Sequence, residues 1–407
     1  MSAPSPAAQV RPRVALILAL LATLGSYTID AFFPSMRAMS VEFGITYWQV
    51  QQTLTAYLVP YAAMSVVHGS VSDAVGRRRV VLVGLYLYAM AAMGCALAPS
   101  FTILLICRGL QGMVGGVGMI IGRAVVRDCY SGAQAQRVMS AITIMFSLGP
   151  ALAPIIGGWI HVWMGWRAVF GSMALYAMVL AWMVYHKLPE TLGSAHRTPL
   201  EFGALAGNLF RVARHPEFLL LTAASGLCFL VLQIYMGSAP AIILDHWGGT
   251  EVSFAMLTVP IISGFAIGAL LSGRMAGRFP PERQAGLGYT LLLLATAAML
   301  LMEQYLHDPP VFAQQLLLAC MALAMQLLFP IVTLRILDLF AKSRGAAASA
   351  HTFFLLVAAA VVMGAVAPVL SRSMQYLALT AFLLSLSGWC VWRLARWYQK
   401  KFPVVFD

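Results

Sequence analysis

The chain has 407 residues, of which 61% are hydrophobic and only 10% are charged. A soluble domain carries about 25% charged residues, so this composition argues against a soluble enzyme. Intrinsic disorder is excluded for a related reason, because the chain has more apolar surface than folding requires. The formal net charge of +12 would suggest nucleic acid in a soluble protein. In a membrane protein, Lys and Arg on cytoplasmic loops explain it.

Twelve apolar runs are long enough to cross a bilayer, for which a helix needs about 20 residues. They cover residues 13–33, 50–70, 80–98, 101–123, 138–160, 166–186, 218–240, 253–273, 285–303, 311–334, 346–371 and 376–396. The first run follows two arginines like a signal peptide, but it continues to Asp30 without a short apolar core, so we expect an uncleaved helix. The six cysteines form no CxxC pair, and neither a disulfide framework nor a metal site or cofactor is predicted.

The basic residues predict the orientation of the chain. With a cytoplasmic N-terminus, 22 of the 26 lysines and arginines fall on cytoplasmic segments, and only Arg37, Arg167 and Arg372 fall outside. Arg108 is the only basic residue placed well inside a run, away from its ends. This asymmetry predicts an even number of spans with both termini in the cytoplasm, and it accounts for the net charge without a nucleic-acid partner.

The order of the runs predicts an all-α membrane protein of twelve transmembrane helices in two six-helix pseudo-repeat bundles. The expected parts are a tail (1–12), an N-terminal bundle (13–186), a cytoplasmic linker (187–217), a C-terminal bundle (218–396) and a second tail (397–407). The loop sequence at Gly69 has a weaker counterpart at Gly273, an offset of 204 residues. Duplicated six-helix bundles are typical of secondary transporters.

The loop after the second run carries the most specific motif, Gly69-x3-Asp73-x2-Gly76-Arg77. Its glycines permit a tight turn, and Asp73 can pair with a cation or a helix N-terminus. The motif predicts a cytoplasmic latch made of Gly69, Asp73, Gly76, Arg77, Arg127 and Asp128. An ordinary positively charged loop is the alternative, and it explains the arginines but not the whole set.

This loop motif resembles that of the major facilitator superfamily. Arg108-x2-Gln111-Gly112 is similar to the Arg-x2-Gln-Gly motif of that superfamily, and Gly149-Pro150 with Gly157 is similar to the Gly-Pro motif of its antiporters. The stretch that begins at Gly122 is similar to the end of the fourth span in Bcr/CflA (bicyclomycin-resistance type) multidrug efflux proteins. The resemblance implies a monomeric, multi-pass drug:proton antiporter of the bacterial inner membrane.

Two charges are expected inside the bilayer, Asp30 and Arg108. An arginine at mid-membrane is costly and should face an aqueous cavity or a partner. Burial raises the pKa of a carboxyl group and a nearby arginine lowers it, so a group balanced between the two effects can load and release a proton. We therefore expect Asp30 and Arg108 to couple transport to protons. The alternative for Asp30 is a structural partner of Arg108 or an acid at the outer mouth.

The fifth run combines small residues with prolines that remove backbone donors. Gly149 and Gly157 permit a close helix approach, and Pro150 and Pro154 permit a kink. Spacing alone fits a gating helix and simple dense packing equally well.

Substrate contacts are expected among polar and aromatic residues at membrane depth, although packing explains any single one of them. The candidates are Tyr27, Tyr57, Tyr61, Gln111, Gln233, Tyr235, Gln326, Phe353 and Phe354.

The expected function is a proton-coupled efflux antiporter that exports small drug-like molecules by alternating access. The alternative on the same fold is an exporter of an endogenous metabolite such as a sugar, an amino acid or a siderophore. A membrane-embedded enzyme lacks support, because the sequence contains no HExxH, GxSxG or P-loop motif. The partners are therefore a small-molecule substrate, protons and the lipid bilayer.

Overall fold

The computed structural model describes residues 12–130, 132–193, 197, 202–275, 278–306, 308–340 and 343–401, and within these ranges all regular structure is helical. The tail expected over 1–12 lies almost wholly outside the described residues, as do parts of the expected linker and of the second tail. The prediction of an all-α protein is confirmed for the described part of the chain.

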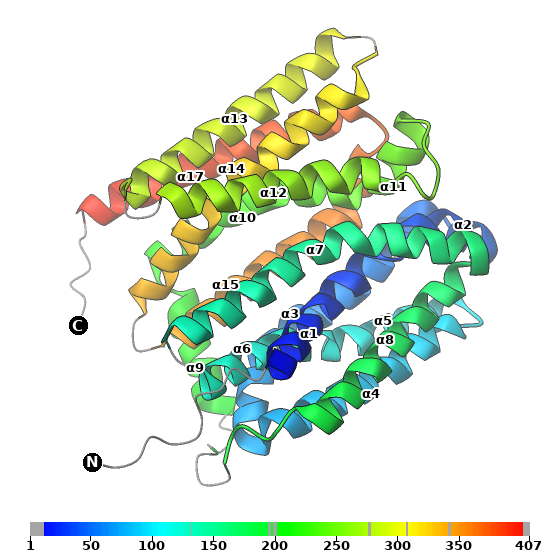
Figure 1. Ribbon diagram of the computed structural model, residues 1–407. Helices are drawn as coiled ribbons and strands as arrows, with labels where there is room; N and C mark the ends of the chain where they lie inside the picture. The colour runs from blue at the N-terminus through cyan, green and yellow to red at the C-terminus, as the bar shows by residue number, and fades with distance from the viewer. Residues whose placement is uncertain are drawn as a thin grey trace. The chain divides into compact units, whose positions relative to one another are not determined.

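The first half of the chain forms long helices joined by short turns (Figure 1). They are α1 (Pro12–Asp30), η1 (Phe33–Ser35), α2 (Met36–Phe43), α3 (Tyr47–Val75), α4 (Arg77–Ala96), α5 (Phe101–Gly115), α6 (Val117–Cys129), α7 (Gly132–Met164) and α8 (Trp166–Lys187). The run 101–123 is interrupted between α5 and α6 at Gly116, and the first run ends as a helix at Asp30, before a 3-10 turn that contains Pro34. Pro34 fits at the start of this turn, where its missing N–H leaves no bond unmade.

The second half repeats this pattern of long helices. They are α9 (Phe202–Ala213), α10 (Pro216–Gly237), α11 (Ala239–Ala241), η3 (Ile242–His246), α12 (Ala255–Met275), α13 (Pro281–Tyr305), α14 (Val311–Leu339), α15 (Arg344–Val361), η4 (Val362–Val366), α16 (Ala367–Leu370) and α17 (Met374–Lys401). Helix α9 lies inside the segment expected to be a linker, and the sequence reading missed it. The elements η3 and η4 are single π-helical turns.

The chain divides into two compact units. Unit 1 comprises Met1–Ile45 and Ala56–Leu200, and unit 2 comprises Thr46–Thr55 and Glu201–Asp407. Within unit 1, α1 packs along α7 and α4 packs along α8; within unit 2, α13 packs against both α14 and α17 (Figure 1). The bundle boundaries expected from the sequence stay a prediction.

Eleven helical segments in the described part of the chain are long and apolar enough to cross a membrane. The expected span at residues 138–160 lies in α7 and is not among these eleven. Within α7, the segment Leu152–Met164 forms a shorter apolar helix. The count of twelve spans and the cytoplasmic termini stay predictions.

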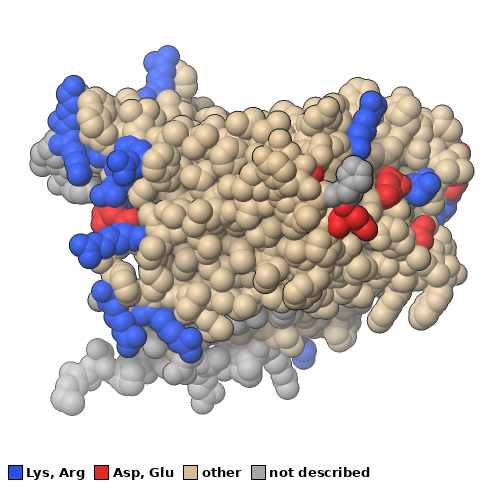
Figure 2. Space-filling view, turned by 90° about the horizontal axis from the view of Figure 1, so that it is seen from above, with Lys and Arg blue, Asp and Glu red and all other residues tan. Residues whose placement is uncertain are grey.

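The surface between the helix ends is apolar, as a lipid-facing surface should be. Figure 2 shows a face almost free of charge, with Lys and Arg gathered at one end and most of the visible Asp and Glu at the other. Large side chains such as Leu294 (62% exposed) and Met90 (63% exposed) lie on the outside of the helices.

Candidate functional site

Asp30 is the last residue of α1, and its side chain is buried with only 6% exposure. Within the described ranges, no hydrogen bond or ion pair reaches its carboxylate, and in particular none comes from Arg108. Moving an unpaired, ionised carboxylate from water into the protein interior costs roughly several kcal/mol. A proton or a cationic ligand would relieve that cost, so Asp30 has the properties expected of an exchangeable site.

Arg108 is completely buried in α5. One guanidinium nitrogen donates to Gln111 Oε1 at 2.9 Å and to the carbonyl oxygen of Thr28 at 3.4 Å. The guanidinium carbon lies over three aromatic rings, at 4.5 Å from the centroid of Phe32, 4.8 Å from Tyr57 and 5.6 Å from Phe170. Aromatic faces stabilise a desolvated cation by about 2 kcal/mol or more. The arginine is therefore held by an aromatic cage and amide oxygens within unit 1.

Two polar side chains of α1 form hydrogen bonds to the neighbouring helix α8. Thr23 Oγ1 lies 2.6 Å from the hydroxyl of Tyr176, and the hydroxyl of Tyr27 lies 2.7 Å from Ser172 Oγ, both on α8. These bonds fix the Tyr27 side chain against α8. Its expected place in a substrate cavity stays a prediction.

The remaining substrate candidates fall into two groups, one in each unit. In unit 1, the rings of Tyr57 and Tyr61 lie 5.7 Å apart, next to the cage around Arg108. The Tyr57 hydroxyl is buried without a hydrogen-bond partner among the described residues. An unsatisfied buried hydroxyl is costly, and a ligand group would remove that cost.

In unit 2, Gln233 and Tyr235 lie at the end of α10. The Gln233 amide donates to the sulfur of Met363 at 3.8 Å, whereas the buried hydroxyl of Tyr235 has no partner in the described ranges. Gln326 packs against Gly268, because a Cβ added to that glycine would lie 2.8 Å from the Cβ of Gln326. The neighbouring rings of α15 pack edge to face with centroids 5.7 Å apart (Phe353 and Phe354).

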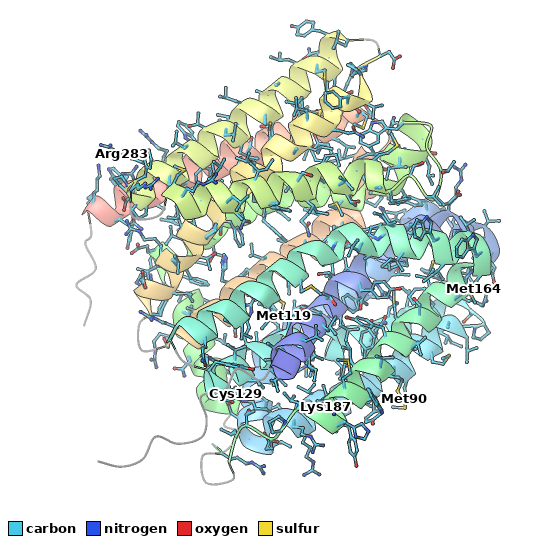
Figure 3. The ribbon with its side chains drawn as sticks, in the orientation of Figure 1. Met90, Met119, Cys129, Met164, Lys187 and Arg283 are labelled. Carbon is cyan, nitrogen blue, oxygen red and sulfur yellow. The ribbon has the colours of Figure 1, made fainter. Side chains whose placement is uncertain are left out.

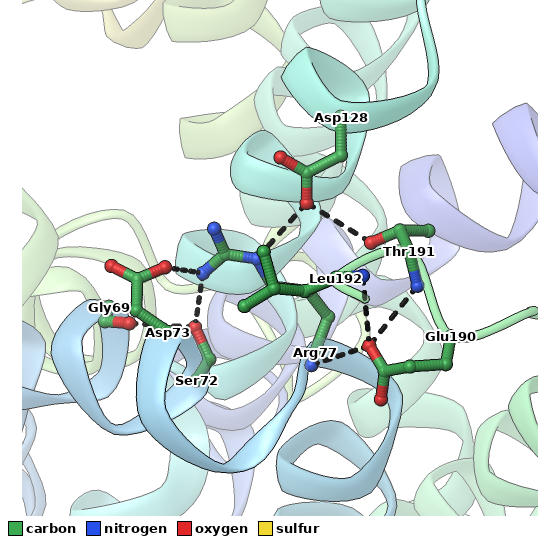
Figure 4. Close-up of polar contacts among 8 residues, drawn as sticks. All are labelled: Gly69, Ser72, Asp73, Arg77, Asp128, Glu190, Thr191 and Leu192. Carbon is green, nitrogen blue, oxygen red and sulfur yellow. Dashed lines mark hydrogen bonds and ion pairs between the residues drawn. The ribbon is translucent and has the colours of Figure 1, made fainter. Parts of the chain in front are cut away.

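The motif between α3 and α4 forms a compact polar cluster, which we call the cytoplasmic cluster after the side of the membrane on which the sequence predicts it (Figure 4). Arg77 is at its centre: its Nε donates to Asp128 Oδ2 at 3.1 Å, another nitrogen donates to Ser72 Oγ at 2.6 Å, and the same side chain pairs with Asp73. The Gly69 carbonyl accepts from Ser72 Oγ at 2.8 Å. The structure thus brings Asp73, Arg77 and Asp128 together, while no ion pair to Arg127 is present in the described part of the chain.

The sequence reading missed a further member of this cluster, Glu190. Its Oε1 accepts from the backbone N–H of Arg77 at 2.9 Å, of Thr191 at 3.1 Å and of Leu192 at 3.3 Å (Figure 4). Thr191 Oγ1 also donates to Asp128 Oδ2 at 3.1 Å. Because Arg77 is the first residue of α4, Glu190 places a negative charge at a helix N-terminus, where it is stabilising.

Gly76 makes this arrangement possible. Its φ of +116° and ψ of 142° belong to a region that other residues rarely adopt. A Cβ at this position would lie 2.6 Å from Glu190 Oε2. The glycine is therefore required both by the backbone conformation and by the approach of the Glu190 side chain.

The expected gating helix is the continuous helix α7, with Pro150 and Pro154 in its interior. A Cβ on Gly149 would lie 2.5 Å from Ser26 Cβ, and one on Gly157 would overlap the backbone carbonyl of Ala31. Both glycines therefore allow α7 to approach α1 closely, at the level of Asp30. Whether this helix is a gate stays a prediction.

Two further acids are buried in unit 2, Glu303 at the end of the run 285–303 and Glu217 at the end of the expected linker. Glu303 (6% exposed) accepts from Gln314 Nε2 at 2.6 Å, and Gln314 in turn accepts from the Trp247 indole. Glu217 (3% exposed) accepts from Gln399 Nε2 at 2.6 Å. Amide partners from neighbouring helices compensate both carboxylates.

Comparison with known proteins agrees with this architecture. The Major Facilitator Superfamily family pattern matches residues 15–368. The uncharacterized MFS-type transporter YdgK of Bacillus subtilis is 28% identical over 309 residues, which cover 75% of this chain and 76% of the relative. The bicyclomycin resistance protein homolog of Haemophilus influenzae is 27% identical and covers 72% of this chain and 71% of its own. A chloramphenicol resistance protein of Pseudomonas aeruginosa is 30% identical over a region that covers 65% of this chain and 60% of the relative.

Solved structures agree on the fold. A bacterial homolog of the human lysosomal transporter Spinster, in an inward-facing conformation, superposes with a TM-score of 0.71 at 15% identity, covering 99% of this chain and 100% of that one. The peptide transporter POT gives a TM-score of 0.73 at 16% identity, with 94% of each chain covered.

Proposed function

Because the chain belongs to the Major Facilitator Superfamily, and is therefore a multi-pass membrane transporter of small molecules rather than an enzyme, we propose that it is a proton-coupled efflux antiporter for small drug-like molecules. The drug-resistance names of several relatives support an efflux role. The protein would act as a monomer in the bacterial inner membrane, with both termini in the cytoplasm. The concentration of basic residues on one set of loops supports this orientation.

The observation that carries the proposal is the isolation of Asp30. It is a buried carboxyl group without a hydrogen bond or ion pair in the described residues, it ends the first helix, and α7 packs closely on that helix. In the proposed cycle, Asp30 binds a proton from outside and releases it to the cytoplasm, while substrate moves the opposite way. Binding of substrate at a midplane site and rocking of the two halves would give alternating access.

Other residues take supporting roles in this cycle. The caged Arg108 provides a fixed positive charge in the same unit as Asp30. Tyr57 and Tyr235, whose buried hydroxyls lack partners in the described ranges, are the best-supported substrate contacts. The cytoplasmic cluster would act as the latch, and α7 would move as the gating helix.

The test compares Asp30→Asn with Asp308→Asn in drug-sensitised cells and in everted membrane vesicles. Asp308 is an exposed acid outside any helix, so its substitution controls for the loss of one negative charge. We expect Asp30→Asn to abolish resistance and ΔpH-driven drug uptake into vesicles, and Asp308→Asn to retain both.

Two outcomes would contradict parts of the proposal. Uptake that persists in Asp30→Asn and is insensitive to an uncoupler would exclude proton coupling through this residue. A wild-type protein that confers no resistance to any drug, yet exchanges protons for a sugar, an amino acid or a siderophore, would make it a metabolite exporter.

A further inference from the structure

A groove of about 470 Å³ opens on the surface of unit 2 between the start of α13 and the end of α17. Its floor is Trp392, which is only 7% exposed and stacks on Tyr289 with ring centroids 4.9 Å apart and an interplanar angle of 24°. Gly286 leaves room for this ring, because an added Cβ would lie 3.3 Å from Trp392 Cη2. The stacked rings and the glycine give the groove a fixed floor.

One end of the groove is strongly basic. Arg283, Arg393 and Arg396 line it, and none of the three forms an ion pair in the part of the chain that the structure describes. Figure 3 shows Arg283 at the end of unit 2 where α17 finishes. The acid in the lining, Glu282, is already paired with Arg335. Glu282 also lies within electrostatic reach of Arg396, so the lining sets three arginines against one carboxylate, and an excess of positive charge remains.

The arginines are fixed by tryptophan rings. The guanidinium of Arg393 lies 5.6 Å from the ring centroid of Trp389, and that of Arg396 lies 5.3 Å from the ring centroid of Trp392. Tryptophan and arginine together are typical of the level at which lipid headgroups lie. Cation–π contacts also reduce the side-chain entropy that the arginines lose when an anion binds.

The other end of the groove is apolar or neutral. Leu287 and Thr290 lie one to two turns further along α13 than Arg283, and Trp389 lies one turn before Arg393 on α17. Leu287 is 52% exposed on the outer surface of the helix. The lining therefore changes from basic to apolar along the helix axes, in the direction that leads from the membrane surface to its interior.

We propose that this groove binds an anionic phospholipid, with its phosphate against Arg283, Arg393 and Arg396 and an acyl chain along Leu287 and Thr290. Basic pockets between transmembrane helices are a recognised means of binding anionic headgroups. A free phosphate would use the basic end only, whereas the apolar continuation fits a lipid. The site lies wholly within unit 2 and does not depend on the proposed transport mechanism.

The experiment measures phosphatidylglycerol retention by the full-length protein in a neutral detergent, using native mass spectrometry with phosphatidylcholine as the reference lipid. The charge variant is Arg283→Ala with Arg393→Ala. Its matched control is Arg274→Ala with Arg278→Ala, two basic residues at the end of α12 and in the following turn, outside the groove lining. A third variant, Thr290→Trp, fills the apolar end without changing charge.

We expect phosphatidylglycerol to bind in preference to phosphatidylcholine. The charge variant should weaken its binding roughly 30-fold, since each basic residue at a membrane surface contributes a factor of about five. Thr290→Trp should also weaken binding, and the matched control should leave it unchanged. Size-exclusion chromatography confirms that each variant is folded.

Three outcomes would overturn the proposal. The first is an equal loss in the matched control, which would make the effect one of general charge. The second is equal retention of the two lipids. The third is displacement of phosphatidylglycerol by inorganic phosphate with no effect of Thr290→Trp, which would identify a site for soluble anions.

Discussion

Replacing Gly76 by alanine tests the geometry of the cytoplasmic cluster directly. The substitution imposes a side chain on a residue with φ of +116° and brings its Cβ to 2.6 Å from Glu190 Oε2. Two costs should result. Strain at such a φ is worth about 1–3 kcal/mol. Displacing Glu190 breaks its charged hydrogen bond to the Arg77 N–H, worth about 1.5–3 kcal/mol in a buried setting and less in a partly exposed one.

A matched position separates the two costs. Gly165 begins α8 as Gly76 begins α4, with φ of +81°, but no atom lies within 4 Å of the Cβ that alanine would add. Gly165→Ala should therefore lower the free energy of unfolding by the strain alone, about 1–3 kcal/mol. Gly76→Ala should lower it by about 1–2 kcal/mol more.

The assay is reversible unfolding in mixed micelles, with hydrogen exchange at the Arg77 amide as a local measure. Glu190→Ala removes the group that the new Cβ meets first, and the other neighbour, Arg197 Nη2 at 3.1 Å, is the end of a flexible side chain that can move. In that background Gly76→Ala should therefore cost no more than Gly165→Ala. If Gly76→Ala alone costs the same as Gly165→Ala, or if the Arg77 amide stays protected in it, the contact with Glu190 does not support the loop.

Two further predictions concern helix packing and one buried acid of unit 2, Glu303. A Cβ on Gly112 would overlap a backbone carbonyl of α3, whereas one on Gly109 would lie 3.7 Å from the nearest atom. Gly112→Ala should therefore lower the free energy of unfolding by more than about 2 kcal/mol, and Gly109→Ala should be nearly neutral. Equal effects of the two substitutions would contradict this packing. Gln314→Ala leaves buried Glu303 without its donor and should cost about 1–3 kcal/mol. The half-buried neighbour Gln315, which donates only to a backbone carbonyl at 2.9 Å, is the control, and a comparable loss there would show that the Glu303 bond does not matter.

The sequence predicted the helices well and their ends less well. Apolar runs identify spans because lipid demands them, and each of the twelve runs coincides with helix in the structure. The break at Gly116 was missed because the sequence stays apolar through it, and helix α9 was missed because it lies outside every apolar run. The superfamily was recognisable from residues of the loop and of the span that carries Arg108, and the family match confirms it.

The environment of the charges could not be read from the sequence. The cage around Arg108 is built from Phe32 and Phe170, which are far apart in sequence and ordinary in composition. Glu303 lies near a helix end, where only the neighbouring Gln314 decides whether an acid is buried or solvated. Glu190 reaches the cytoplasmic cluster from 113 positions away. Such contacts depend on how the helices pack, which no local pattern records.

The solitary position of Asp30 has an energetic consequence. It is the buried acid of unit 1 in the described ranges, and one carboxyl group carries one proton. Exchange of one proton for a neutral molecule would therefore move one net charge across the bilayer per cycle. A membrane potential of 100 mV then contributes about 2.3 kcal/mol, which supports a gradient of roughly 50-fold because 1.36 kcal/mol corresponds to one power of ten. The voltage would thus drive export even when the two sides have the same pH.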